Sequence, residues 1–264
     1  MMSDKCDQER DGQTAIEPSV PSHTIEQTHD QTVILTCHTY ESAYQKWQGF
    51  RNMGLVPPLW RDTPSLTFYK MLGSGGGDGF SLWPNWGQYY SLTTWDTPEA
   101  ADQYLKEGSL HPAIKRLRRH QSSEWSLILR PYKAHGAWDH QSPFRVNKRI
   151  GRPGKSEPIV ILTRARIRAR KLMSFWRDVP QVSRSMHGIE GNLLAVGIGE
   201  LPLIQQATIS LWESEAAMRS FAYTGAAHRD VIKRTREMQW YSEELFARFQ
   251  VIDRRGELPT QAMN

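Results

Sequence analysis

The runs that decide the fold are residues 32–36 (TVILT) and residues 159–163 (IVILT), which share one pattern in a chain of 264 residues. Both are rich in β-branched residues and carry no charge, which predicts buried strands. A pattern that returns far along the chain indicates an internal repeat. We therefore compare the residues that follow each run, to see how much of the chain is doubled.

The similarity continues through the whole of both halves. It covers a second pair of strand-like segments at 90–96 (YSLTTWD) and 207–213 (ATISLWE), short alanine-bearing helices near 100–104 and 217–221, two histidine phrases at 109–116 (SLHPAIKR) and 226–234 (AAHRDVIKR), and closing strands at 125–132 and 245–252. Each half reads strand, helix, strand, strand, helix, strand, which is the ferredoxin-like order.

This order predicts an α+β fold in which tandem ferredoxin-like repeats pack as a pseudo-dimeric α+β barrel and enclose a cavity. The expected divisions are a disordered acidic tail, the first repeat, a basic linker rich in Pro and Gly, the second repeat and a C-terminal tail, at residues 1–30, 31–138, 139–157, 158–256 and 257–264. The first repeat is longer because it carries a glycine-rich insertion at residues 73–79.

Charge and composition narrow the classes of protein. Residues 1–30 hold seven acids against Lys5 and Arg10, a net charge of −5. Because the whole chain has a net charge of +5, the remaining residues carry +10, which favours anionic partners. Two cysteines cannot form a disulfide framework, so we expect a cytoplasmic protein. No run of about 20 apolar residues occurs, so any membrane contact is expected to be peripheral. We see no nucleic-acid-binding module.

Common catalytic and phosphate-binding motifs are missing from the sequence. The glycine-rich insertion has neither the G-x-G-x-x-G spacing nor a following Gly-Lys-Ser/Thr. We interpret it as an inserted loop that could cap a cavity. No G-x-S-x-G, H-E-x-x-H or zinc-type Cys/His spacing occurs, which argues against hydrolases and zinc enzymes.

The two histidine phrases give the candidate ligand. If residues 228–239 are helical, His228 shares an apolar stripe with Val231 and Ile232 and faces inward. An inward histidine is most often an ordinary core residue, but on a helix beside a cavity it is also what a haem proximal site needs. Its counterpart His111 precedes Pro112 and is expected to mark a helix start.

Charged residues offer further candidates. Arg164, Arg166, Arg168 and Arg170 alternate with apolar residues, which places them on one face of an extended segment. A solvated strand face is the usual role of such a run, and a basic wall for carboxylates or lipid phosphates is the alternative. Glu200, Glu243 and Glu244 could handle protons, although we expect surface roles for the adjacent pair Glu243 and Glu244.

Five segments resemble the spheroidene monooxygenase family of carotenoid biosynthesis. They begin at Met53 (MGLVPPLW), Leu72 (LGSGGGDGFSLWPNWGQY), Leu127 (LILRPYKAHGAW), Val196 (VGIGELPLIQQATISLW) and Ala227 (AHRDVIKRTREMQWYSEELFARFQVI). The resemblance spans residues 32 to 256. It implies a tandem α+β barrel and an enzyme that inserts oxygen from O2 at C-2 of an acyclic carotenoid to give a 2-keto product, with haem as cofactor.

The resemblance also implies roles for particular residues. His228 would be the haem iron ligand, and Arg164, Arg166 and Arg229 would be partners of the haem propionates. Glu124 departs from the family, whose members often carry a histidine there. Because a carotenoid resides in a bilayer, peripheral contact with the inner membrane is expected, through the basic body and aromatic residues near Trp83 and Trp86.

Two alternatives remain open on the sequence alone. The chain could be a non-catalytic protein of the same fold that binds haem or an apolar ligand. It could also be a cofactor-free monooxygenase, in which the substrate itself activates oxygen, built from the same repeat.

Overall fold

The structure is a computed structural model that describes residues 30–76, 83–106, 108, 110–174, 189–201, 204–224 and 240–259. Its elements, in chain order, are β1 (Thr32–Thr39), α1 (Ala43–Leu55), α2 (Pro57–Trp60), β2 (Leu66–Gly75), β3 (Pro84–Trp95), α3 (Pro98–Lys106), α4 (Pro112–Arg118), β4 (Ser123–Gly136), β5 (Ile159–Ile167), the 3-10 helix η1 (Ala169–Lys171), β6 (Asn192–Leu201), β7 (Gln205–Trp212), α6 (Glu215–Thr224) and β8 (Tyr241–Arg255). The strands expected from the repeated segments are confirmed.

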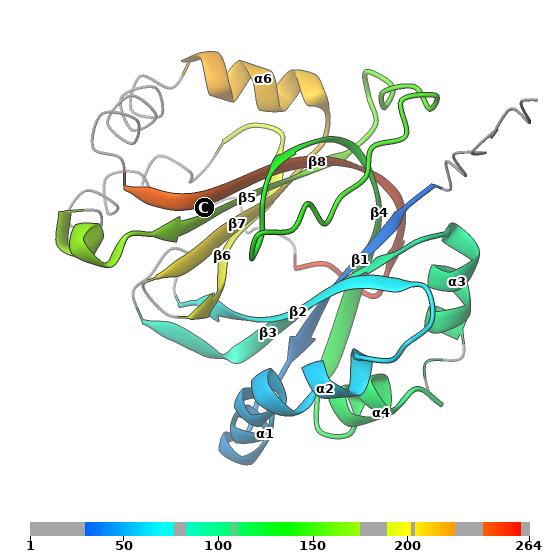
Figure 1. Cartoon of the computed structure of the whole chain (residues 1–264), viewed down its shortest axis with the longest axis vertical. Helices are drawn as coiled ribbons and strands as arrows, with labels where there is room; N and C mark the ends of the chain where they lie inside the picture. The colour runs from blue at the N-terminus through cyan, green and yellow to red at the C-terminus, as the bar shows by residue number, and fades with distance from the viewer. Residues whose placement is uncertain are drawn as a thin grey trace, which may run out of the picture.

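The strands form one closed antiparallel barrel in the order β1-β3-β2-β6-β7-β5-β8-β4 (Figure 1). The first half contributes β4-β1-β3-β2 and the second half contributes β8-β5-β7-β6, so both halves have the same internal order. The two halves join at two places. Strand β2 pairs briefly with β6, where Gly73 lies opposite Gly199, and β4 pairs with β8 along most of the length of β4. The expectation of a barrel is therefore confirmed.

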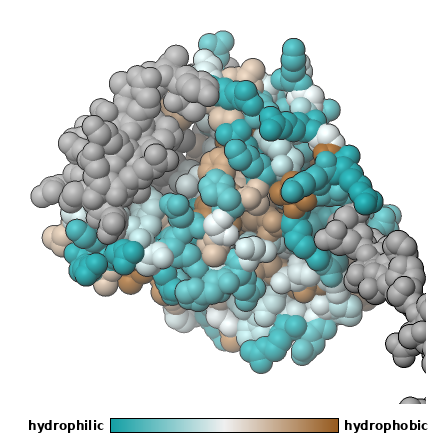
Figure 2. All heavy atoms as spheres, turned by 45° about the horizontal axis from the view of Figure 1, so that its top comes forward, coloured by the Kyte–Doolittle hydropathy of each residue, from teal (hydrophilic) through white to brown (hydrophobic). Residues whose placement is uncertain are grey.

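The core fills the inside of the barrel with apolar side chains from both halves. Val33 and Leu35 of β1 and Val160 and Leu162 of β5 are among its buried members. Because strand residues alternate between two faces, every second residue of each strand points inward. The surface seen in Figure 2 is mostly hydrophilic, with a smaller hydrophobic area near the centre of the view.

The segment between β4 and β5 is more than the linker that its composition predicts. Residues 137–158 contain no helix and only one isolated bridge, from Trp138 to Gln141. Trp138 and Phe144 are nonetheless buried in the barrel core, where both rings contact Phe68. This connection is therefore part of the barrel's packing.

Helices cover the outside of the barrel. In the first half, α1, α2 and α4 lie together at one end of the molecule (Figure 1), over a cluster that includes Tyr40, Val56 and Trp60. In the second half, α6 packs near Trp212. Among the described residues, no helix has the length and hydrophobicity to cross a membrane.

Local sequence explains where two helices begin. Ser42 and Gln45 form a reciprocal capping box before α1, which satisfies backbone N–H groups that have no partner within the helix. His111 caps α4, because its Nδ1 accepts a hydrogen bond from the N–H of Ala113 (3.2 Å). The sequence prediction of a helix start at His111 is thus confirmed. The expected helix over 228–239 lies outside the described residues, as does the glycine-rich insertion beyond Gly76.

Candidate functional site

The outer face of the first-half sheet is closed. In its middle row Met71 pairs with Ser91, Ser91 with Thr36, and Thr36 with Ser126. Thr36 is buried, and its hydroxyl lies 2.8 Å from that of Ser126. Helices and large side chains therefore leave no room for a planar ligand against this sheet.

A buried polar network occupies the same face. The ring of His38 lies 2.7 Å from Gln121 Oε1 and 3.0 Å from Ser91 Oγ, and burial lowers the pKa of the imidazole. Glu124 accepts hydrogen bonds from Arg118 (2.9 and 2.5 Å) and Gln121 (2.7 Å) and lies 3.9 Å from His38. Glu124 thus belongs to an ion-paired network that ties α4 to the sheet.

Among the described residues, which leave out 175–188 and 225–239, the corresponding face of the second half carries an exposed side chain at its centre. The matching row consists of Gly197, Thr208, Thr163 and Phe246, paired in that order across β6, β7, β5 and β8. Thr163 is exposed, whereas its counterpart Thr36 is buried. Glycine stands where the first half has Met71. We call this row, with its neighbours Ala165 and Ala195, the open sheet face.

Small side chains make the open sheet face suitable for a flat ligand. Ala165 stands in the strand position that His38 occupies in the first half, and Ala195 stands where the first half has Tyr69. Because strand residues alternate, these side chains point away from the filled barrel interior. Over β6, β7 and β5 the described residues leave more space for a planar macrocycle such as haem than on the first-half face. On β8, Phe246 stands where the first half has Ser126 and borders this space.

Arg164 does not lie on the open sheet face. It points into the barrel, is 1 % exposed, and pairs with Glu243 and with Asp139 (3.4 Å), while its guanidinium lies over the Trp138 ring (5.5 Å). The interpretation of this arginine as part of a solvated strand face is wrong, because β5 forms part of a closed barrel. Its counterpart in the first half is Cys37, which is buried and free.

Glu243 is held by an unusual turn. Asp139 and His140 have positive φ angles of 51° and 64°, and their backbone N–H groups donate to the Glu243 carboxylate at 3.1 and 2.7 Å. Partial burial opposes its ionisation, but these N–H groups and the Arg164 guanidinium outweigh it, so its pKa is lowered. The expected surface role of Glu243 is wrong, whereas Glu244 is exposed.

Two further residues extend this cluster to the neighbouring strands. Lys70 of β2 pairs with Asp139 and with Glu200 (2.7 Å). Glu200 also accepts a hydrogen bond from the Trp138 indole (2.6 Å). Together with Arg164 and Glu243, these residues fix the 137–144 segment at the end of the barrel. Sequence reasoning missed Lys70 and Asp139. The alternation of β2 could have revealed Lys70, since it stands between the inward-facing Phe68 and Leu72.

The remaining predicted site residues are placed as follows. Arg166 follows Arg164 on the same side of β5 and is partly exposed at the strand end. Arg168 and Arg170 lie beyond β5. His228 and Arg229 lie outside the described residues. Within the described residues, no group of three or more His, Cys, Asp or Glu side chains could hold a metal ion.

Comparisons with known proteins give the fold and the family of the chain. No family profile matches the chain. Two solved structures of aldoxime dehydratases, one in complex with butyraldoxime, superpose with TM-scores of 0.57 and 0.58 at 10 % and 8 % identity. They cover 90 % of this chain and 88 % and 86 % of their own chains. At these identities the likeness shows the fold alone.

Three curated relatives are much closer in sequence, and each is a spheroidene monooxygenase. The Rhodobacter capsulatus protein is 37 % identical over 195 residues, which cover 74 % of this chain and 79 % of the relative. The Rubrivivax gelatinosus protein is 34 % identical, covering 74 % and 72 %, and the Cereibacter sphaeroides protein is 35 % identical, covering 72 % and 57 %. The chain therefore belongs to the spheroidene monooxygenase family and is a monooxygenase-like oxidoreductase.

Proposed function

We propose that the chain is a haem-dependent monooxygenase of carotenoid biosynthesis, which inserts oxygen from O2 at C-2 of an acyclic carotenoid to give a 2-keto product. The observation that supports this most is the similarity to three spheroidene monooxygenases over about three quarters of the chain. Their names specify spheroidene as the substrate. We infer that the cofactor binds at the open sheet face.

The proposal includes the architecture. We infer that the halves are tandem ferredoxin-like repeats packed as a pseudo-dimer. Both halves share one strand order, and both carry the same local bond: the Trp95 indole donates to Thr93 (3.0 Å), and the Trp212 indole donates to Ser210 (2.9 Å). Duplication supplies two sheet faces, and we assign the ligand to the second-half face, where Thr163 is exposed among the described residues.

In this proposal His228 would hold the haem iron, and Arg229 would be a partner of the propionates. Arg166 shares the barrel-facing side of β5 with Arg164, so we do not assign it to a haem on the open sheet face. Bound haem would supply the oxidising power that no side chain has, which an unactivated C–H bond requires. Ala165, Gly197 and Thr208 would border the ring without filling its space. Arg164 would have to leave Glu243 to reach a propionate, so we assign it instead to holding the barrel end.

The substrate and the stoichiometry imply further partners. One atom of each O2 enters the carotenoid and the other leaves as water, so an electron donor is required. Converting a methylene group to a ketone takes two such rounds, followed by loss of water. An acyclic carotenoid partitions into lipid, so the enzyme is expected to make peripheral contact with a membrane surface.

The absorption spectrum of protein purified from haem-supplemented cells tests the proposal. We expect a Soret band in the wild type and in His111→Ala, and its loss in His228→Ala. The His111 variant is the matched control, because it changes the other histidine phrase. A wild type without a Soret band would overturn haem dependence, and an unchanged band in His228→Ala would overturn this ligand.

Product analysis separates the alternatives. Cells that make an acyclic carotenoid and express the protein should accumulate a 2-keto carotenoid. A Soret band without a keto product would favour a non-catalytic binding protein. A keto product from protein without haem would favour cofactor-free chemistry.

A further inference from the structure

Helix α1 has its polar residues on the buried side and its aromatic residues on the exposed side. It buries Gln48, Gly49 and Asn52, whereas Tyr44 and Trp47 are 60 % and 56 % exposed. A surface helix normally buries its apolar stripe and exposes its polar one. The apolar side of α1 therefore points away from the protein that carries it.

The buried side of α1 explains why polar and small residues are required there. A Cβ atom at Gly49 would lie 2.7 Å from the Tyr89 ring and 2.8 Å from the Tyr40 ring. Asn52 donates to the Tyr40 hydroxyl (3.3 Å). The helix thus packs closely on two tyrosines through a glycine and an amide. These contacts fix the rotation of α1 about its axis, and this rotation places its aromatic side chains on the outside.

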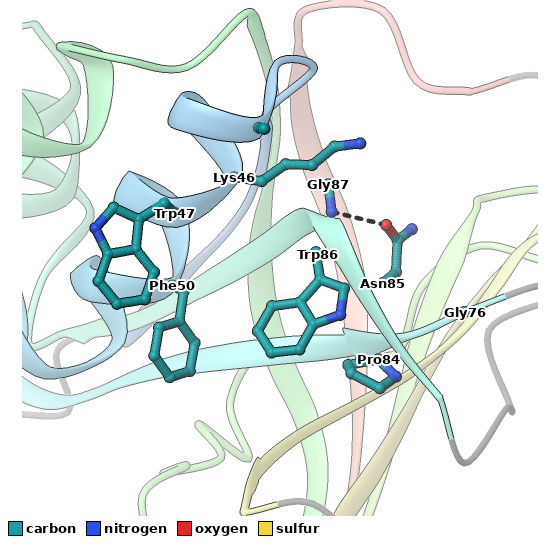
Figure 3. Close-up of a pocket in the computed structure, with 9 residues that line it drawn as sticks. Lys46, Trp47, Phe50, Gly76, Pro84, Asn85, Trp86 and Gly87 are labelled. Carbon is teal, nitrogen blue, oxygen red and sulfur yellow. Dashed lines mark hydrogen bonds between the residues drawn. The ribbon is translucent and has the colours of Figure 1, made fainter.

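The outward aromatic residues continue onto β3. The rings of Trp47 and Phe50 are stacked with centroids 5.7 Å apart, and Phe50 meets Trp86 at 5.5 Å. These three residues, with Lys46, line an open groove of about 650 Å³ whose other walls are Ala43, Gly76, Pro84, Asn85 and Gly87 (Figure 3). We call this surface the aromatic groove. An exposed aromatic surface of this kind marks an interaction site.

The charge of the aromatic groove and of the neighbouring helices indicates its partner. Residues 41–62 and 111–124, which form the end of the molecule with α1, α2 and α4, carry seven Lys and Arg side chains against three acids, and Lys46 among them lines the groove. Lys46 lies beside the rings (Figure 3), and Arg51 is exposed on the same helix. One of the acids, Glu124, is paired with Arg118. Aromatic rings bordered by cations match the boundary between the headgroups and acyl chains of an anionic bilayer.

We propose that the aromatic groove docks the enzyme on an anionic lipid surface. Trp47, Phe50 and Trp86 enter the headgroup region, while Lys46 and Arg51 meet lipid phosphates. This inference rests on the proposed function in one respect, since a carotenoid substrate gives the enzyme a reason to reach a bilayer. It goes further by assigning the contact to one face of one helix and the start of one strand.

Flotation of the purified full-length protein with vesicles tests the docking. The vesicles are phosphatidylcholine alone or phosphatidylcholine mixed with phosphatidylglycerol. We expect the wild type to bind the mixed vesicles and the W47S/F50S/W86S variant to lose roughly tenfold or more of this partition. The K46E/R51E variant should lose the preference for the anionic lipid. Ile252→Ser is the matched control, because it removes an exposed apolar side chain from β8 and should bind as the wild type does.

Several outcomes would overturn the inference. The triple variant could float as the wild type does, or the wild type could ignore both kinds of vesicle. A wild type that forms dimers without lipid, while the triple variant stays monomeric, would mean that the aromatic groove binds protein instead. Detergent-dispersed carotenoid distinguishes the proposals: if the triple variant converts it at the wild-type rate, only docking is impaired. If the wild type docks through the groove but converts no carotenoid, the proposed function alone fails.

Discussion

The two halves of the barrel have the same strand order, but the outer faces of their sheets differ in burial. In the first half, Thr36 is buried beneath helices and beside His38, and in the second half its counterpart Thr163 is exposed beside Ala165. The strand order is the same in both. Among the described residues, a duplicated unit therefore keeps its inner face for barrel packing, while the outer faces of the two copies differ in side-chain size and in the exposure of the central threonine.

The inner faces differ as well, and the largest expected effect comes from that difference. Arg164 occupies the position of Cys37 and holds Glu243 and Asp139 at the barrel end. Arg164→Met should lower the free energy of unfolding by about 3–5 kcal/mol, because it leaves the buried carboxylate of Glu243 without its cation. Urea denaturation measures this loss. The double variant R164M/E243M should recover much of it, and a double variant less stable than R164M would contradict the account.

Tryptophan substitutions compare the outer faces directly. Thr36→Trp should destabilise the protein by about 1–3 kcal/mol, because the side chain is overpacked beneath helices. Thr163→Trp should change stability by less than about 0.5 kcal/mol, because the position is open. Thermal or urea unfolding of the pair gives the answer. Equal losses in both variants would mean that the two faces are equally closed.

The dependence of stability on pH should reveal His38, which is buried on the outer face of the first half only. Burial lowers the pKa of His38 from 6.5, so the unfolded chain binds the extra proton first and stability should fall as the pH drops below about 6.5. The slope for one group is at most about 1.4 kcal/mol per pH unit. Unfolding of His38→Asn at a series of pH values should show a shallower decline. A second decline, below pH 4.5, is expected from Glu243, whose pKa is also lowered. An unchanged profile in His38→Asn would show that His38 does not carry the first decline.

The smallest effect concerns the histidine phrases. His111→Ala removes the cap of α4 and its contact with Thr63 (3.0 Å), and should cost about 1 kcal/mol without changing any haem spectrum. Denaturation and absorption spectra of the same sample check both parts. A lost Soret band in this variant would mean that the first phrase also serves the cofactor.

Much of the fold could be predicted from the sequence, because the repeat and the β-branched runs mark the strands. The start of α4 at His111 was predictable for a similar reason, since the residue before a helical proline is a natural cap. The burial of Arg164 was not, because an alternating arginine run is compatible with water as well as with a barrel interior. Only closure of the sheet shows which side faces inward.

The candidate site was harder to predict. Its open character depends on the absence of large side chains at Ala165 and Gly197, and small residues carry little signal in a single sequence. The orientation of α1 was also hidden, since apolar residues at helical spacing, such as Tyr44, Trp47 and Phe50, lie on the buried face of most surface helices. Their outward position follows from Gly49 packing against Tyr40 and Tyr89.

Absorption titration with hemin tests most directly whether the open sheet face of the second half holds the ligand. The proteins are the wild type, Thr163→Trp and Thr67→Trp, the last placing the same side chain at an exposed threonine on a first-half strand. The account predicts equal affinity for the wild type and Thr67→Trp, and affinity at least about tenfold weaker for Thr163→Trp, since a bulky ring would occupy the binding surface. Wild-type affinity in Thr163→Trp would contradict it.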